Sequence, residues 1–222
     1  MLKILLQSLL LASTGLLSVG SITIVILLLI SKRGWRNGLG YALGYTTAYS
    51  IIGVLVVLWG YRATEKGTSE SSIFFPVFLM FFGTLLLWLA FKNWRKPASV
   101  EEEEPRFFSM MDKITPPKAF GFGAMVTVIN FKNLALFMSA LSVVILSDLI
   151  LTEKIIITLL VALVFCLSVI IPVLIYLLFP KHATELLNAI KDRINTYRRP
   201  IGIGIPLFFG LIFLIKGISA FL

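Results

Sequence analysis

The sequence predicts an all-α integral membrane protein with six transmembrane helices, and three observations carry this prediction. Of the 222 residues, 58% are hydrophobic and 14% are charged, whereas about a quarter of the residues in a soluble domain are charged. Six apolar runs are each long enough to cross a bilayer as a helix. Basic residues gather in alternate connections between these runs. We therefore interpret the net charge of +9 as a sign of which connections face the cytoplasm, and not as a sign of nucleic-acid binding.

The predicted spans are the runs 4–30, 38–59, 73–91, 120–146, 155–179 and 201–222. The first run is interpreted as a retained span and not as a cleaved signal peptide, because its uncharged stretch is too long. The connections 31–37, 92–119 and 180–200 hold 3, 6 and 5 of the 20 Lys and Arg residues. By the positive-inside rule these connections face the cytoplasm, so the N and C termini are predicted to lie outside.

The spacing of the runs predicts two repeats. Residues 1–92 form the first three-helix repeat, residues 93–118 form a cytoplasmic linker, and residues 119–222 form the second repeat, including an amphipathic helix at 181–199. Because each repeat has an odd number of spans, the two repeats must cross the membrane in opposite senses. This is the inverted-repeat arrangement that is common in transporters.

The fourth run contains the leading candidate for a functional residue. Lys132 lies twelve residues past Phe120, which places it roughly 18 Å into the span, near the middle of the hydrocarbon core. Asn130 and Asn133 flank it. An ionisable side chain at that depth points to a substrate-binding site. The alternative is that Lys132 snorkels to water or bonds backbone carbonyls as a structural contact.

The first run has an interruption at a comparable depth, formed by Ser18, Gly20 and Ser21. If both helices break at these places, Asn130 or Asn133 would cap one half-helix, and Ser18 or Ser21 would cap the other. Two positive helix ends beside Lys132 would suit an anion. The alternative for the first run is that its small residues only allow close helix packing.

The remaining residues limit the chemistry. All eleven Asp and Glu lie outside the six runs, and the chain has one cysteine, Cys166, and one histidine, His182. We therefore expect no metal site, no cofactor and no enzymatic activity, since no nucleophile–base pair is recognisable. Pro172 and Pro206 are predicted to kink the fifth and the sixth span. Gly38, Gly40 and Gly44 are predicted to let a neighbouring helix approach the second span.

Several stretches of the chain resemble a known family. The sequence Asp112-Lys113-Ile114-Thr115-Pro116, then Ala119, Gly121 and the stretch from Asn130 to Leu136 resemble the second half of the GAP family, which includes sulfolipid-addressing and peptidoglycolipid-exporting proteins within the LysE transporter superfamily. The first half is similar at 18–22, 31–33, 37–38 and Gly44. The family pattern has prolines where this chain has Val19, Ser21 and Phe131, so the polar residues carry over while the proline-enforced break does not.

The resemblance implies export of a lipid, lipid-like or amphipathic solute across the bacterial inner membrane by a multi-pass protein. The expected partners are membrane lipids, with an anionic lipid as the candidate substrate and a homodimer as the candidate assembly. Two alternatives stay open. One is an exporter of small, amino-acid-like solutes, and the other is a non-transporting accessory subunit of a lipid-handling complex.

Overall fold

The computed structural model describes residues 1–31, 33–65, 69–95, 114–180 and 182–219. Within these ranges the chain is helical almost throughout and contains no strand, so the predicted all-α fold is confirmed. In chain order the helices are α1 (Leu2–Ala12), the 3-10 helix η1 (Ser13–Leu17), α2 (Val19–Ile30), α3 (Gly34–Glu65), α4 (Ser69–Arg95), α6 (Pro116–Ile129), α7 (Phe131–Ile145), α8 (Leu151–Phe165), α9 (Leu167–Leu178), α10 (Ala183–Thr196) and α11 (Arg198–Ser219).

Only some of the predicted spans are straight helices. In α3, the stretch Gly34–Arg62 is long and apolar enough to cross a membrane by itself. Three other runs are divided into two helices that meet at a bend: 57° between α1–η1 and α2, 74° between α6 and α7, and 59° between α8 and α9. Counting each bent pair as one span gives up to four spans in the described part of the chain, and α11 adds a shorter apolar helix. Six spans and inverted repeats therefore remain predictions.

Glycines bring the backbones of α3 and α6 into contact. A Cβ at Gly40 would lie 2.6 Å from the carbonyl oxygen of Pro116, and a Cβ at Gly44 would overlap the carbonyl of Phe120. On the facing helix, Gly123 leaves no room for a Cβ against the α3 backbone. The predicted close approach of a neighbouring helix to Gly40 and Gly44 is therefore confirmed, and the neighbour is α6.

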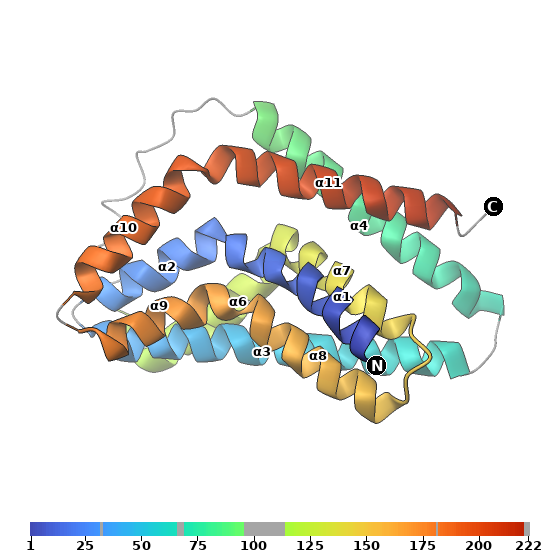
Figure 1. Ribbon diagram of the computed structural model, residues 1–222, viewed down its shortest axis with the longest axis horizontal. Coiled ribbons are helices and arrows are strands. Elements are labelled where there is room, and N and C mark those ends of the chain that lie inside the picture. Colours follow the sequence, from blue (N-terminus) through green and yellow to red (C-terminus); the bar gives the residue numbers. More distant parts are fainter. Residues whose placement is uncertain (32, 66–68, 96–113, 181, 220–222) are drawn as a thin grey trace.

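The helices α4 and α11 form a second close pair, which lies along one edge of the molecule (Figure 1). Their backbones meet at two glycines. A Cβ at Gly83 would lie 3.1 Å from the carbonyl oxygen of Gly210, and a Cβ at Gly210 would lie 3.0 Å from that of Gly83. As in other membrane helix pairs, small residues replace large apolar side chains at the contact.

Helices from before and after residues 96–113 pack against one another throughout the structure. Apart from the pairs α3–α6 and α4–α11, helix α1 contacts α7 and α8, and α2 contacts α9. Each of these contacts joins a helix of the first predicted repeat to a helix of the second. The two sequence halves are thus interleaved.

The structure describes part of the connections that are predicted to be cytoplasmic. The predicted linker lies mostly outside the described residues, including its run of four glutamates at 101–104. The predicted amphipathic helix at 181–199 is present as α10, in which Leu187 is buried while Glu185 and Arg193 are exposed. Its apolar side packs on α2 and α9.

The bend in the fifth apolar run lies at Cys166, and the prediction that Pro172 produces it was wrong. Pro172 lies further along, inside the continuous helix α9. The backbone N–H groups of Val169 and Ile170 both donate to the Cys166 carbonyl, at 3.0 and 3.1 Å, so α9 begins directly after the bend. The chain has already changed direction before the missing N–H of Pro172 affects the helix.

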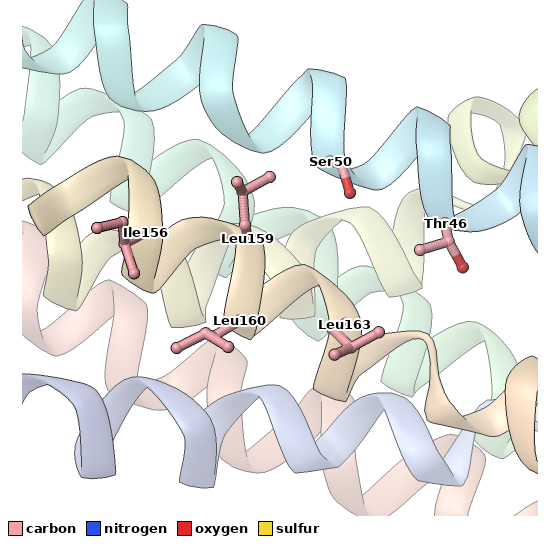
Figure 2. A pocket seen from close by; sticks show the side chains of 6 residues that line it. All are labelled: Thr46, Ser50, Ile156, Leu159, Leu160 and Leu163. Carbon is pink, nitrogen blue, oxygen red and sulfur yellow. The ribbon is translucent and has the colours of Figure 1, made fainter. Parts of the chain in front are cut away.

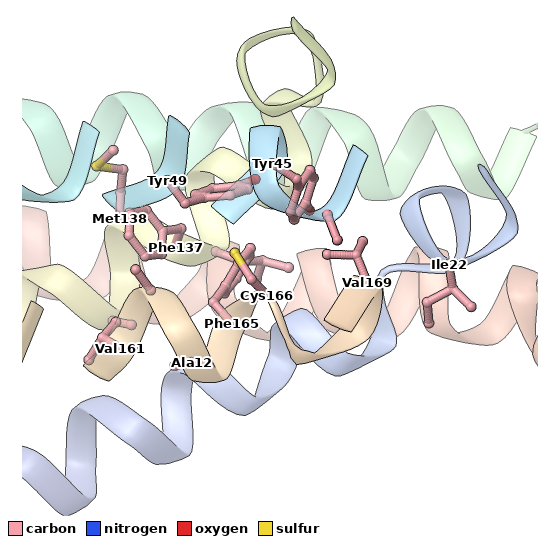
Figure 3. Close-up of a cluster of buried hydrophobic side chains, with 14 of the residues drawn as sticks. Ala12, Ile22, Tyr45, Tyr49, Phe137, Met138, Val161, Phe165, Cys166 and Val169 are labelled. Atoms are coloured by element: carbon pink, nitrogen blue, oxygen red, sulfur yellow. The ribbon is translucent and has the colours of Figure 1, made fainter. Parts of the chain in front are cut away.

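The core around the bends is aromatic. Tyr41, Tyr45 and Tyr49 follow one another at intervals of one helical turn on a single face of α3, and all three are fully buried. The ring centroid of Tyr49 lies 4.8 Å from that of Phe137 in α7 and 4.9 Å from that of Phe165 at the end of α8 (Figure 3). The tyrosine face of α3 therefore packs where broken helices meet.

Candidate functional site

The break between α6 and α7 lies at Asn130. Its backbone dihedral angles are φ −81° and ψ 72°, outside the helical region, and its side-chain oxygen accepts a hydrogen bond of 3.3 Å from the backbone N–H of Asn133. This confirms the prediction that Asn130 caps a half-helix. The break forms although Phe131 stands where the related family has proline, so the asparagine cap and the surrounding packing suffice to produce it.

The break in the first run lies at Ser18, between η1 and α2. The dihedral angles of Ser18 are φ −78° and ψ 77°, close to those of Asn130. The predicted helix break is present, but the predicted capping of α2 by Ser18 or Ser21 was wrong, because no side chain caps the start of α2. Instead, the Ser18 hydroxyl bonds to other side chains, which leaves the first N–H groups of α2 without an intrahelical or side-chain acceptor.

Hydrogen bonds join the two breaks, and we call these four side chains the junction: Ser18, Ser21, Tyr45 and Asn133. The Asn133 side-chain amide donates to the Ser18 hydroxyl and, at 3.1 Å, to the Tyr45 hydroxyl. Ser18 donates to Ser21 at 3.0 Å, and Ser21 donates to Tyr45 at 3.2 Å. All four residues are at most 3% exposed. A polar cluster this deeply buried is stable only when its members are bonded to each other or to a ligand.

The structure brings Ser18, Ser21 and Asn133 together and places the other predicted site residues beside them. Asn130 begins the same helix as Asn133 and caps it. Lys132 lies in the first turn of α7, directly before Asn133, and is half-buried. Gly20 lies in the first turn of α2 and is exposed, and a Cβ there would meet nothing within 4 Å. The first turn of α2 is therefore open on the Gly20 side.

The electrostatic field of the junction favours negative charge. Helices α2 and α7 both begin at the junction, and the N-terminus of each carries the positive end of a helix dipole. The charge of Lys132 lies one residue into α7 and has the same sign. In a medium of low dielectric constant these contributions are larger than in water.

Sequence reasoning missed Tyr45, although the spacing of Tyr41, Tyr45 and Tyr49 could have revealed it. Residues four apart share one helix face, and three tyrosines on one face of an apolar helix indicate a polar lining. Tyr45 accepts hydrogen bonds from both broken segments, through Ser21 and Asn133. It therefore connects α3 to both breaks at once.

Sequence reasoning also failed to identify Lys154 as a residue that stabilises the fold. It is buried at the start of α8, and its Nζ donates a 2.8 Å hydrogen bond to the Ile145 carbonyl at the end of α7. The same ammonium lies 5.5 Å from the ring centroid of Tyr61. A positive charge at the C-terminus of a helix is favourable. Helix α7 is thus held by Asn130 at its N-terminus and by Lys154 at its C-terminus.

These features define a class of protein. The chain is a helical membrane protein in which apolar helices are broken, two of them at the polar residues Ser18 and Asn130. Its residues 9–219 match the SfLAP family, described as Sap, sulfolipid-1-addressing protein, and the chain belongs to this family. The resemblance to the sulfolipid-addressing group is thereby confirmed. No curated protein and no solved structure matches the chain.

Proposed function

We propose that this protein is an exporter or translocator that moves an anionic lipid, or a lipid-like or amphipathic solute, across the bacterial inner membrane. The observation that carries the proposal is the junction, where the N-termini of two broken helices meet and are tied together by Asn133. Transporters use such half-helix N-termini to bind anionic substrate groups in the middle of the membrane. Family membership supports a lipid as the substrate, because the family is named for addressing a sulfolipid.

In this proposal the chain crosses the membrane six times, as two inverted three-helix repeats with both termini outside. The two breaks support the repeat, since Ser18 and Asn130 occupy equivalent places and share nearly the same backbone dihedral angles. The headgroup would bind at the junction, with Lys132, Asn130, Asn133, Ser18, Gly20 and Ser21 as its contacts. Lys132 would supply the charge, the Asn and Ser side chains would orient the group, and exposed Gly20 would leave room for it.

A groove on the surface of the helix bundle favours an amphipathic substrate over a small polar one. It has a volume of about 340 Å³, lies between α3 and α8, and is lined by Thr46, Ser50, Ile156, Leu159, Leu160 and Leu163 (Figure 2). Its four aliphatic side chains are 40–48% exposed. Thr46, which follows Tyr45 of the junction, lies at one end of the groove. An acyl chain in the groove would therefore run toward a headgroup at the junction.

The proposed carrier is a multi-pass protein of the inner membrane with no enzymatic activity. Its partners would be membrane lipids, and two copies would form a homodimer. The two competing functions make different predictions. An exporter of small, amino-acid-like solutes needs a closed pocket of matching size, whereas the groove between α3 and α8 is open and lined mainly by aliphatic side chains. An accessory subunit would copurify with a stoichiometric partner and would tolerate loss of the charge of Lys132.

The test is export in a deletion strain that is complemented with the wild type, Lys132→Gln or Lys118→Gln. Lys118→Gln is the matched control, because Lys118 is exposed in the first turn of α6 and away from the junction. Quantitative lipidomics of the inner membrane and of the outer envelope would show which lipid is retained. We expect the wild type and Lys118→Gln to restore export of one anionic lipid class, and Lys132→Gln to fail at equal protein levels.

Three other outcomes decide against this proposal. Full export by Lys132→Gln would remove the lysine from the site. Intracellular accumulation of small solutes in the deletion strain, with unchanged lipids, would favour the small-solute exporter. If neither lipids nor small solutes change, the accessory-subunit function is favoured instead.

A further inference from the structure

The third helix break, at Cys166, lies against the other two. Gly15 of η1 packs so closely on the carbonyl of Phe165 that a Cβ at Gly15 would overlap it. The ring of Phe165 lies 4.9 Å from Tyr49, whose ring lies 4.9 Å from that of Tyr45 in the junction. The N-terminus of α9, directly after Cys166, is therefore a third half-helix end in the same region.

Buried hydroxyl groups near this break lack hydrogen-bond partners. Among the described residues, the hydroxyl oxygens of Tyr41, Thr46, Tyr49 and Ser168 are buried and unpartnered. The two tyrosines are fully buried, and Ser168 is 3% exposed in the first turn of α9. Figure 3 shows the hydroxyl end of Tyr49 directed toward Tyr45, with Cys166 on the α8–α9 side of this pair. Buried polar groups are nearly always bonded, so unpartnered ones mark the place of a ligand or of ordered water.

We propose that the break at Cys166 is part of the substrate site, and that Tyr49, Ser168 and Tyr41 donate hydrogen bonds to the oxyanion of the substrate headgroup. This inference rests on the function proposed above and extends it. Hydroxyl groups and helix N–H groups are donors, so they match an anionic group that can only accept. Tyr45 already accepts from Ser21 and Asn133, so its own O–H proton is left for a further acceptor. The headgroup thus binds among three half-helix ends.

The first experiment measures binding of octyl sulfate to the purified protein in phosphatidylcholine nanodiscs, with octyl glucoside as the uncharged amphiphile. We expect Tyr49→Phe and Ser168→Ala each to weaken octyl sulfate binding roughly tenfold, since each removes one hydrogen bond to a charged group. Ser139→Ala is the control for Ser168→Ala, because the buried Ser139 hydroxyl donates to the Leu136 carbonyl of its own helix, at 2.6 Å. Tyr197→Phe, at an exposed position between α10 and α11, is the control for Tyr49→Phe.

The outcomes separate this inference from the proposed function. If the wild type binds no octyl sulfate, the anion site itself is wrong. If the wild type binds and both Tyr49→Phe and Ser168→Ala bind equally well, the break at Cys166 does not belong to the site and its hydroxyls hold only water. The same conclusion follows if Ser139→Ala and Tyr197→Phe weaken binding as much as the test variants.

A second measurement uses the wild-type chain and does not depend on how the variants fold. Cys166 is the single cysteine of the sequence and is buried at the third break. Because the Cys166 thiol is buried, N-ethylmaleimide reaches it only when this region opens, and bound octyl sulfate should slow the modification while octyl glucoside should not. Cys166→Ala gives the background. An unchanged labelling rate at saturating octyl sulfate would place the anion elsewhere and overturn the inference.

Discussion

The side-chain amide of Asn133 donates a hydrogen bond to the hydroxyl of Ser18, a residue 115 positions earlier in the chain. Both residues lie at helix breaks, and both breaks leave helix N-termini inside the protein. Unpaired backbone groups inside a membrane protein must face other protein groups or a water-filled cavity, because lipid cannot form hydrogen bonds with them. The hydrogen bond between Asn133 and Ser18 therefore holds together two segments that neither lipid nor a continuous helix would stabilise.

Removal of the Asn133 amide should weaken both the fold and the function. Asn133→Leu keeps the approximate size of the side chain but loses the bonds to Ser18 and Tyr45. We expect the free energy of unfolding to fall by about 1–3 kcal/mol and export to be lost. Unfolding in SDS, followed by circular dichroism, measures the first effect. Gln7→Leu, at an exposed position of α1, should leave both properties unchanged. Wild-type stability of Asn133→Leu would show that the junction is not held by this amide.

A single methyl group at Gly44 should prevent α3 and α6 from packing. In Gly44→Ala the new Cβ would overlap the backbone carbonyl of Phe120, which cannot move without shifting α6. We expect a loss of at least about 2 kcal/mol, or failure to fold, because overpacked contacts commonly cost 1–3 kcal/mol. Gly121→Ala is the matched control, since its Cβ meets nothing within 4 Å. The two variants are compared by size-exclusion chromatography and thermal unfolding. Equal stability of the two variants would contradict the close α3–α6 contact.

Lys154 should stabilise the C-terminus of α7. In Lys154→Met the aliphatic stem is kept, but the hydrogen bond to the Ile145 carbonyl and the favourable charge are lost. We expect a decrease of about 1–2 kcal/mol in the free energy of unfolding. Lys118→Met, at an exposed position, provides the control for loss of a charge. If hydrogen exchange at the end of α7 is equally slow in both variants, Lys154 does not hold this helix.

The groove between α3 and α8 should select for substrates with a long apolar tail. Leu160→Trp adds bulk to its lining and should reduce export of long-chain substrates more than that of short-chain analogues. Leu174→Trp makes the same change at an exposed position of α9 outside the groove and should have little effect. Export assays with a series of chain lengths measure the preference. The same reduction for every chain length would exclude the groove as the tail site.

Much of this architecture was predictable because it depends on the lengths of apolar runs. Six runs separated by charged connections predicted where the helices lie, and the polar residues near position 130 predicted a break. The sequence does not single out the residue at the first break, since Ser18, Gly20 and Ser21 are neighbours and packing decides which one leaves the helix. That residue is Ser18, where the chain can bond to Asn133.

The third break had no signal in the sequence. Cys166 lies between Phe165 and Leu167, in a run of apolar residues that are compatible with a continuous helix. Pro172 gave a misleading signal for the position of this break, because it is the sixth residue of the continuous helix α9. The bend at Cys166 follows from contacts with η1 and with Tyr49, which are distant in sequence. Only the tertiary structure brings them together.

The interleaving of the two halves has a consequence for biosynthesis. During translation α3 and α4 are synthesised before α6 and α11 exist, so the close backbone contacts at Gly44 and Gly83 cannot form at that stage. Their partners arrive only after residues 96–113 have been synthesised. The two sequence halves are therefore not independent units of folding. Each half should be short-lived when made alone, and the two halves made together as separate chains should reassemble.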